Sequence, residues 1–179
     1  MPSLFLHAVD LLWCPSEPGG FVSTLRDVGL LGAAVPSAGE YEFLAGDQFL
    51  QRIMFLGCAP QVRLNPDEPG EGQALCFVRL RLYDETTFLS DEPFPAVRCP
   101  GCRAPAEVSA HSQSDALHGC AQCGKETALA QLDWRRGAGY ARCFIEVCGI
   151  YPHEAVPSDR LLAGLADMSG GDWVYFYRR

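Results

Sequence analysis

Apolar residues follow two different spacings along this 179-residue chain. Residues 3–13 form an almost continuous apolar run, which favours a short strand buried on both faces. In residues 74–83, aliphatic residues and a cysteine alternate with arginines and aromatic residues. This alternation is typical of an antiparallel strand with one wetter face. Residues 173–177 are aromatic or β-branched and predict a final strand. These segments indicate a sheet.

Other segments have helical spacing. Apolar residues recur every three or four positions over residues 21–31 and again over residues 48–56, so both segments are predicted to be helices. A third helix is expected to begin after Ser158, a good N-cap residue, and to end at Gly170. The first helix is expected to end at Gly32. The second is expected to have Asp47 as its N-cap residue and to end at Gly57.

The connections complete the expected fold. Two apolar runs, 127–134 and 140–150, flank a short Arg/Gly-rich segment and predict a β-hairpin. Residues 61–64 could add a strand, and residues 84–95, with two acidic pairs and two prolines, are expected to be a connection. The sequence therefore predicts an α+β fold: a mixed sheet with a few short helices. We expect one discontinuous body made of residues 1–95 and 136–179, with residues 96–135 inserted into it.

The charge is unevenly distributed. The net charge is −8, and residues 1–95 contain 5 Lys and Arg against 13 Asp and Glu, whereas residues 96–179 contain 9 of each. This acidity argues against nucleic acid as the principal partner, because nucleic-acid-binding proteins usually carry a basic surface. Lys125 is the only lysine beside 13 arginines, a bias typical of a GC-rich bacterial genome.

Nine cysteines raise the question of the compartment. The first 13 residues have no basic start, and Asp10 interrupts their apolar run, so a signal peptide is not expected. No stretch reaches the ~20 apolar residues that a membrane span needs. We therefore expect a cytoplasmic protein with reduced thiols, in which closely spaced cysteines bind metal.

Four of the cysteines have metal-ligand spacing. Cys99-Pro100-Gly101-Cys102 and Cys120-Ala121-Gln122-Cys123 are two Cys-x-x-Cys pairs, separated by 17 residues. Four thiolates suit a tetrahedral zinc ion, and a closed set of four sulfurs is typical of a structural site. Gly124 can adopt the positive φ that lets backbone N–H groups point at the sulfurs. The sequence thus predicts a structural Zn²⁺ held by Cys99, Cys102, Cys120 and Cys123.

This pattern resembles the zinc-ribbon superfamily. The Cys-Pro-x-Cys and Cys-x-x-Cys-Gly-Lys signatures fall on Cys99 to Cys102 and on Cys120 to Lys125, and the likeness covers only about 40 residues. It implies a four-cysteine zinc ribbon over residues 96–135 but no particular activity, because such ribbons serve in many kinds of protein. Rubredoxin-like iron sites use similar turns; the polar segment 103–119 favours zinc.

Other residues could take part in chemistry. His111 and His118 lie between the knuckles, and each is expected to be a loop residue or a donor to a sulfur rather than a ligand. The insertion over residues 96–135 is also expected to be too small to build its own core. The five other cysteines have no metal spacing and are expected to be buried free thiols: Cys14, Cys58, Cys76, Cys143 and Cys148.

Three roles remain open. The preferred hypothesis is a non-enzymatic zinc protein whose ribbon contacts another protein. No membrane partner is expected. A nucleic-acid-binding role would use the basic residues of the ribbon: Arg98, Arg103, Lys125, Arg135 and Arg136. An enzyme would need a pocket on the body that joins His153 or His7 to a cysteine such as Cys14 or to a carboxylate.

Overall fold

A computed structural model describes residues 1–35, 41–57, 62–67, 74–91, 93, 96–108 and 114–179. Six strands form one sheet in the spatial order β12-β1-β10-β5-β3-β2, and every pairing within it is antiparallel. The strands of this sheet are β1 (Ser3–Ala8), β2 (Leu31–Ala34), β3 (Glu42–Ala45), β5 (Phe77–Ser90), β10 (Ala138–Cys148) and β12 (Trp173–Arg178).

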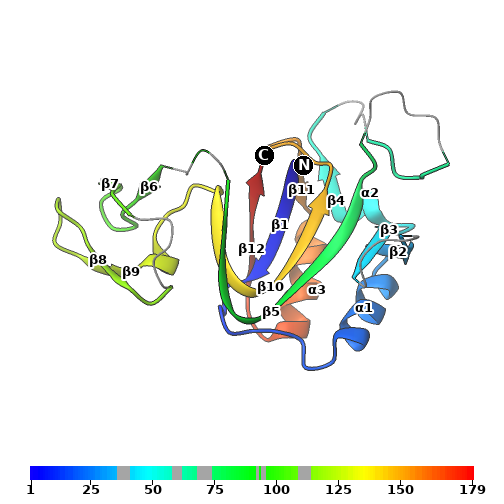
Figure 1. The fold of residues 1–179 in the computed structure, drawn as a ribbon, viewed down its shortest axis with the longest axis horizontal. Coiled ribbons are helices and arrows are strands. Elements are labelled where there is room, and N and C mark those ends of the chain that lie inside the picture. The colour runs from blue at the N-terminus through cyan, green and yellow to red at the C-terminus, as the bar shows by residue number, and fades with distance from the viewer. Residues whose placement is uncertain (36–40, 58–61, 68–73, 92, 94–95, 109–113) are drawn as a thin grey trace.

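Helices cover one face of this sheet (Figure 1). α1 (Pro18–Asp27) and α3 (Asp159–Ser169) bury Leu25 and Leu165 completely against apolar residues of β1, β5, β10 and β12. A single-turn helix, α2 (Phe49–Arg52), adds Phe49 to the same core. The α+β prediction is confirmed: helices pack on one side of an antiparallel sheet.

The other face of the sheet carries an aromatic cluster. Phe5, Phe144 and Phe176 are buried there, and the rings of Phe5 and Phe176 stack with their centroids 5.0 Å apart. β5 and β10 curve strongly beside this cluster (Figure 1), and their register shifts between Ala141 and Cys143. Such a bulge bends and twists the paired strands. The curvature carries the far ends of both strands toward residues 96–135, which we call the cysteine module; the rest of the chain is the body.

Several predicted elements are confirmed. β1 is buried along its whole length but ends at Ala8 rather than at residue 13. β5 contains residues 77–83 of the alternating segment, and β12 is the final aromatic strand. α3 is capped as expected: the Ser158 hydroxyl accepts a hydrogen bond from the Leu161 N–H at 3.2 Å, and Gly170 follows with φ of 75°. In these segments the local pattern and the tertiary fold agree.

The first helix ends earlier than predicted. α1 stops at Asp27, Gly29 turns the chain with φ of 74°, and Leu31 already belongs to β2. A Cβ at Gly29 would lie only 2.7 Å from the side chain of Gln48, so this position has no room for a larger residue. The prediction that Gly32 ends the helix is wrong. Leu31 fits the helical spacing of apolar residues, but it is buried as part of strand β2.

The second predicted helix, over residues 48–56, is wrong beyond its first turn. Gln48, not Asp47, is the N-cap residue of α2, and β4 (Ile53–Phe55) follows at once. β4 pairs antiparallel with β11 (Ala155–Pro157). Its partner strand is about 100 residues away along the chain, and spacing within the segment cannot indicate such a partner.

The hairpin predicted from residues 127–134 and 140–150 is also wrong. β10 pairs with β1 and β5, which are distant in sequence. The segment 127–134 is divided between β9 (Glu126–Ala128) and the 3₁₀ turn η1 (Leu129–Gln131). β5 also extends to Ser90, through a segment expected to be a connection.

Some expectations lie partly outside the described residues. In the segment 61–64, Arg63 forms an isolated bridge with Leu75, whereas Gln61 is outside the described part of the chain, as are Cys58 and His111. Of the helices in the described ranges, none combines the length and the apolar character needed to cross a membrane.

Candidate metal centre

The first cysteine knuckle joins two short strands. β6 (Val97–Arg98) and β7 (Pro105–Ala106) pair antiparallel, and the knuckle turns between them. The Cys99 N–H donates to the Ala104 carbonyl at 2.9 Å, and the Arg103 N–H donates to the Cys99 carbonyl at 2.9 Å. Arg103 has φ of 63°, so the residue after the second cysteine is left-handed.

The second knuckle repeats this geometry. It lies between β8 (Leu117–Gly119) and β9, which pair antiparallel. The Cys120 N–H donates to the Lys125 carbonyl at 3.0 Å, and the Gly124 N–H donates to the Cys120 carbonyl at 2.8 Å. Gly124 has the expected positive φ, 71°. Two matching turns thus present the two Cys-x-x-Cys pairs.

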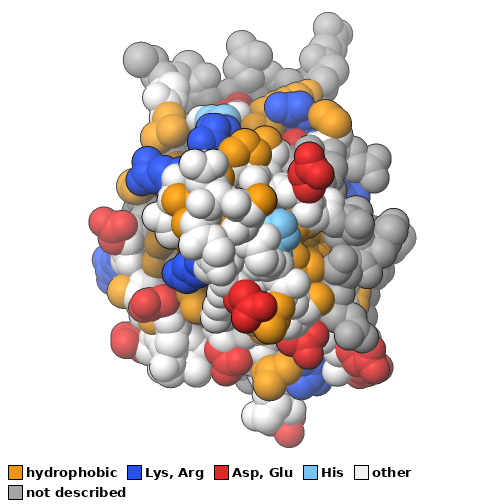
Figure 2. Space-filling model, turned by 90° about the vertical axis from the view of Figure 1, so that its left-hand side faces the viewer, with side chains coloured by type: hydrophobic (Ala, Val, Ile, Leu, Met, Phe, Trp, Pro, Cys, Tyr) orange, Lys and Arg blue, Asp and Glu red, His pale blue; other side chains and the backbone are white. Residues whose placement is uncertain are grey.

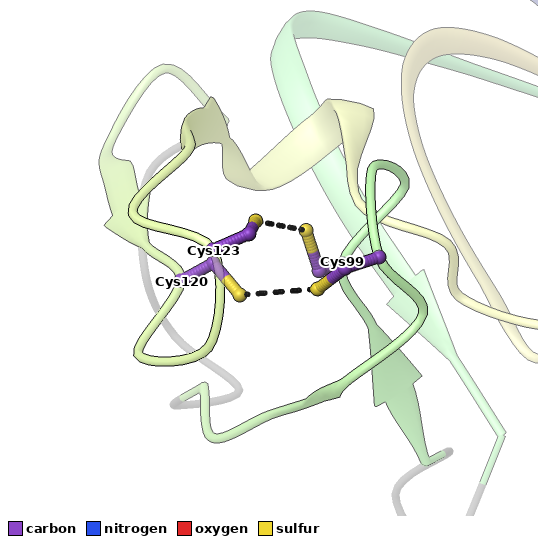
Figure 3. A group of neighbouring side chains, drawn as sticks. Cys99, Cys120 and Cys123 are labelled. Carbon is purple, nitrogen blue, oxygen red and sulfur yellow. Dashed lines mark hydrogen bonds between the residues drawn. The ribbon is translucent and has the colours of Figure 1, made fainter.

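The four thiols meet between the two hairpins (Figure 3). Their sulfur atoms all lie within 4.8 Å of one another; Cys99 Sγ is 3.8 Å from Cys123 Sγ, and Cys102 Sγ is 3.6 Å from Cys120 Sγ. A disulfide would need about 2.05 Å. Zinc–sulfur bonds of about 2.3 Å place the sulfurs of a tetrahedron about 3.8 Å apart. The arrangement is therefore compatible with one metal ion.

Within each knuckle, the two cysteines differ in their exposure to solvent. Cys99 and Cys120, the first cysteine of each knuckle, are buried, whereas Cys102 and Cys123 are exposed. The candidate centre thus lies at the surface of the cysteine module, with one buried and one exposed sulfur from each hairpin.

Backbone N–H groups favour the thiolate form of the buried sulfurs. The N–H groups of Cys102 and Gly101 lower the pKa of Cys99, and Gly101 N lies 3.4 Å from Cys99 Sγ. In the second knuckle, the N–H groups of Cys123 and Gln122 lower the pKa of Cys120 to about 6. Thiolates are the form that binds metal.

Cys102 behaves differently. The Ala104 N–H favours its thiolate, but loss of solvent and the hydrogen bonds with the other three cysteines outweigh it and raise the pKa of Cys102 to about 12. Four adjacent sulfurs cannot all ionise readily, because like charges disfavour one another. A bound cation is the group that would offset this repulsion.

A small apolar cluster supports the base of the module. We call it the basal cluster; its buried members are Val97, Ala106, Leu129, Leu132, Trp134, Ala138 and Tyr140. The Trp134 indole N–H donates to the Leu129 carbonyl at 2.8 Å, and Arg98 and Asp133 exchange two backbone hydrogen bonds of 3.0 Å. The expectation that this segment has no core of its own is therefore wrong in part. The core lies where the module joins β10.

The histidine and basic residues are placed as follows. His118 lies in β8, opposite Thr127, and the close cluster found among the described residues contains the four cysteines without it. On the face that includes the cysteine module, Lys and Arg side chains are interspersed with hydrophobic and acidic ones (Figure 2). Arg98 donates to the Arg103 carbonyl at 3.2 Å, and the Arg136 guanidinium lies 4.5 Å from the centroid of the Tyr175 ring.

The enzyme candidates line three different cavities. His7 lines the first cavity and is 7% exposed. Burial lowers its pKa, and its Nδ1 donates to the Ala8 carbonyl at 2.9 Å. Cys14 lines a separate cavity of about 440 Å³, and burial, only partly offset by Arg142, raises its pKa. His153 lines a third cavity. The structure therefore does not bring either histidine to Cys14.

The cavity at His153 is also lined by the carboxylate of Asp91, but it lies at the junction with the cysteine module, whereas the enzyme hypothesis required a pocket on the body. It has a volume of about 370 Å³ and lies where the cysteine module meets the end of β12. Sequence reasoning missed this cavity, although it had noted Arg135, Arg136 and His153 separately. Its polar lining residues are Asp91, Arg135, Arg136, His153, Tyr177 and Arg179.

The remaining described cysteines behave as apolar residues. Cys76, Cys143 and Cys148 are buried, and burial raises the pKa of each thiol, to about 12 for Cys76 and Cys148. Cys143 belongs to the core on the helix side of the sheet, and Cys148 pairs with Ser3 on β1. These thiols are not placed to bind metal or to react.

The chain was also compared with known proteins. Comparisons with protein-family models, with curated proteins and with solved structures gave no match. The likeness to zinc ribbons thus depends on the four cysteines and on the two hairpins that present them.

Proposed function

We propose that Cys99, Cys102, Cys120 and Cys123 hold one structural Zn²⁺ and that the cysteine module is a zinc ribbon inserted into the α+β body. The spacing of the sulfurs carries this proposal: contacts of 3.6 and 3.8 Å between the knuckles match the geometry of a tetrahedron of four sulfurs around zinc. Four thiolates fill the coordination shell, so water or a substrate has no open position at the metal. The ion would supply folding energy and charge compensation.

The module would act as a docking surface for another protein. Figure 1 shows it projecting from the side of the body, and Leu117 in β8 is 67% exposed. The mixed side chains in Figure 2 suit a protein partner better than a phosphate backbone, which needs a basic surface. The net charge of −8 favours the same choice. We therefore prefer an adaptor role to nucleic-acid binding.

Metal content tests the zinc site. Protein purified under reducing conditions should contain one zinc ion per chain by native mass spectrometry and elemental analysis. Cys102→Ser should lose most of this zinc in a competing chelator. Cys14→Ser is the matched control, because Cys14 lies outside the cluster, and it should keep the metal. Iron in place of zinc, or equal retention by both variants, would contradict the assignment.

Partner capture tests the docking role. Leu117→Asp changes an exposed apolar residue of the module, and Leu12→Asp changes one of the body that is 69% exposed. A protein captured by the wild type should be lost with Leu117→Asp and kept with Leu12→Asp. Steeply salt-dependent binding of RNA or DNA would instead support the nucleic-acid role and count against this one.

A further inference from the structure

Three strained residues line one cavity. Four non-glycine residues have a positive φ in the described part of the chain, and three of them, Arg135, Arg136 and His153, line the 370 Å³ cavity at the end of β12. The fourth, Arg103, lies in the first knuckle. Left-handed non-glycine residues persist where the surrounding structure fixes them, and they gather at functional sites. Three of these four residues line the same cavity, which indicates that their side chains serve a function in it.

Two of them share one tight turn. The Gly137 N–H donates to the Trp134 carbonyl at 2.9 Å, which closes a four-residue turn around Arg135 and Arg136. Their φ values are 52° and 59°. A turn with positive φ at both central positions normally contains Asn-Gly, because other side chains are disfavoured there. Here two arginines occupy these positions.

His153 occupies a comparable position in a second turn. The Glu154 N–H donates to the Tyr151 carbonyl at 3.1 Å, with Pro152 and His153 between them. Proline at the second position and positive φ at the third are features of a type II turn, whose third position strongly prefers glycine. His153 adopts φ of 66° there. Again a polar side chain occupies a position that favours glycine.

Neighbouring contacts hold the arginine turn in place. The Tyr177 N–H donates to the Arg136 carbonyl at 3.0 Å, and the Asp91 N–H donates to the Gly137 carbonyl at 2.7 Å. The Arg135 N–H donates to the Asp133 carboxylate at 2.9 Å. β12 and the residue after β5 therefore fix the backbone from which the two arginine side chains extend.

Among the described residues that line this cavity, basic side chains outnumber acidic ones. Arg135, Arg136 and Arg179 are the basic residues, and Asp91 is the acidic one. Asp91 is engaged with Arg179: its carboxylate accepts from the Arg179 N–H at 2.7 Å and lies 3.8 Å from the Arg179 Nε. Among the ion pairs formed by described residues, none includes Arg135 or Arg136. The Arg136 guanidinium instead lies over the ring of Tyr175, 4.5 Å from its centroid.

We propose that this cavity binds the phosphate group of a small phosphorylated ligand. Planar guanidinium groups match phosphate oxygens through paired hydrogen bonds, and His153 and Tyr177 add further polar atoms to the lining. A volume of about 370 Å³ is in the range of small-molecule sites. The acidic body disfavours a long polyanion. This site is independent of the metal centre and of the docking role.

Calorimetric titration of the full-length, zinc-loaded protein tests the proposal. Inorganic phosphate and adenosine monophosphate are the probes. Both should bind one per chain and compete with each other; tighter binding of the nucleotide would indicate an organic phosphate ester, and equal binding would indicate inorganic phosphate. No binding of either probe at millimolar concentration would overturn the proposal.

Arg136→Gly separates ligand binding from folding. Glycine suits the left-handed backbone, and this gain offsets the lost contact with Tyr175 and the freer unfolded chain, so the variant should melt near the wild-type temperature while its phosphate affinity falls at least tenfold. Arg103→Gly is the matched control: it relieves the same strain outside the cavity and should leave the affinity unchanged. Equal affinity in Arg136→Gly and the wild type would overturn the proposal, as would an oligonucleotide that binds far more tightly than the mononucleotide.

Discussion

In the body, two helices bury one face of a six-stranded sheet, whereas the described part of the cysteine module has four short strands and gives five buried residues to the basal cluster. The body can draw its stability from apolar surface removed from water. The four cysteines are not part of the basal cluster, so the two knuckles need another source of stability. A metal ion is the cross-link that the sulfur geometry supports.

The cysteines of the two regions show the same contrast. Cys76, Cys143 and Cys148 are buried in the body, and burial raises the pKa of each. In the module, backbone N–H groups lower the pKa of Cys99 and Cys120. One residue type thus serves as an apolar core residue in one region and as a candidate thiolate ligand in the other.

Metal removal should have the largest effect on this contrast. Structural zinc contributes on the order of 10 kcal/mol to the folding of small zinc domains. Treatment with a chelator should therefore speed amide hydrogen exchange throughout residues 96–135, while the amides of β1, β10 and α3 stay protected. Exchange mass spectrometry measures both regions at once. Loss of protection across the whole body would show that the two regions do not fold separately.

Leu165→Ala tests the opposite region. Leu165 is fully buried on α3, and truncating a buried leucine costs about 2–5 kcal/mol. The free energy of unfolding of the body, from chemical denaturation, should fall by this amount, and zinc content at room temperature should not change. A variant that loses zinc while its body remains folded would contradict the separation.

Acidification should weaken the body through Glu146. Its carboxylate is 5% exposed and accepts hydrogen bonds from Arg81 at 2.6 Å and from Arg79 at 3.2 Å. Burial alone would raise the pKa of Glu146, but the hydrogen bond and charge of Arg81, with Arg79, lower it below its ordinary value of 4.5. The folded state therefore binds fewer protons than the unfolded state. The stability that the Glu146 carboxylate contributes above pH 4.5 is lost as the pH falls through the lowered pKa of Glu146.

Glu146→Gln is the matched variant for this effect. It should cost about 1.5–3 kcal/mol near neutral pH, the range for hydrogen bonds to charged groups, and toward the lower end because both arginines are partly exposed. Its stability should also fall less steeply than that of the wild type below pH 4.5. Unfolding curves followed by circular dichroism at several pH values test this; parallel curves would rule out Glu146 as the source.

Ser158→Ala should have the smallest effect. The Ser158 hydroxyl caps α3 by accepting from the Leu161 N–H, and loss of such a cap costs about 1 kcal/mol. The melting temperature of the body should drop by a few degrees, whereas exchange in the cysteine module should not change. Ser158→Asp, which can also accept the hydrogen bond, should restore most of the loss.

The sequence predicted what depends on local pattern. The first strand, although predicted to continue to residue 13, and the capped helix after Ser158 were recognisable because burial and capping agree with spacing there. The four cysteines were recognisable because ligand spacing is itself a local signal. Residues 53–55 were misassigned because β11, the strand that pairs with them, is remote in sequence.

The cavity at the junction could not be predicted for a related reason. Arg135, Arg136 and His153 lie in separate turns, and only the fold brings those turns beside the end of β12. Their positive φ values are also invisible in the sequence, since arginine and histidine do not indicate a left-handed backbone. Strain and tertiary neighbourhood had to come from the structure.

X-ray absorption at the zinc edge tests the central claim most directly. Protein purified with its metal should give four sulfur neighbours at about 2.3 Å and no nitrogen or oxygen in the first shell. A mixed shell, a smaller number of sulfurs, or a disulfide in place of the metal would contradict a closed centre formed by Cys99, Cys102, Cys120 and Cys123.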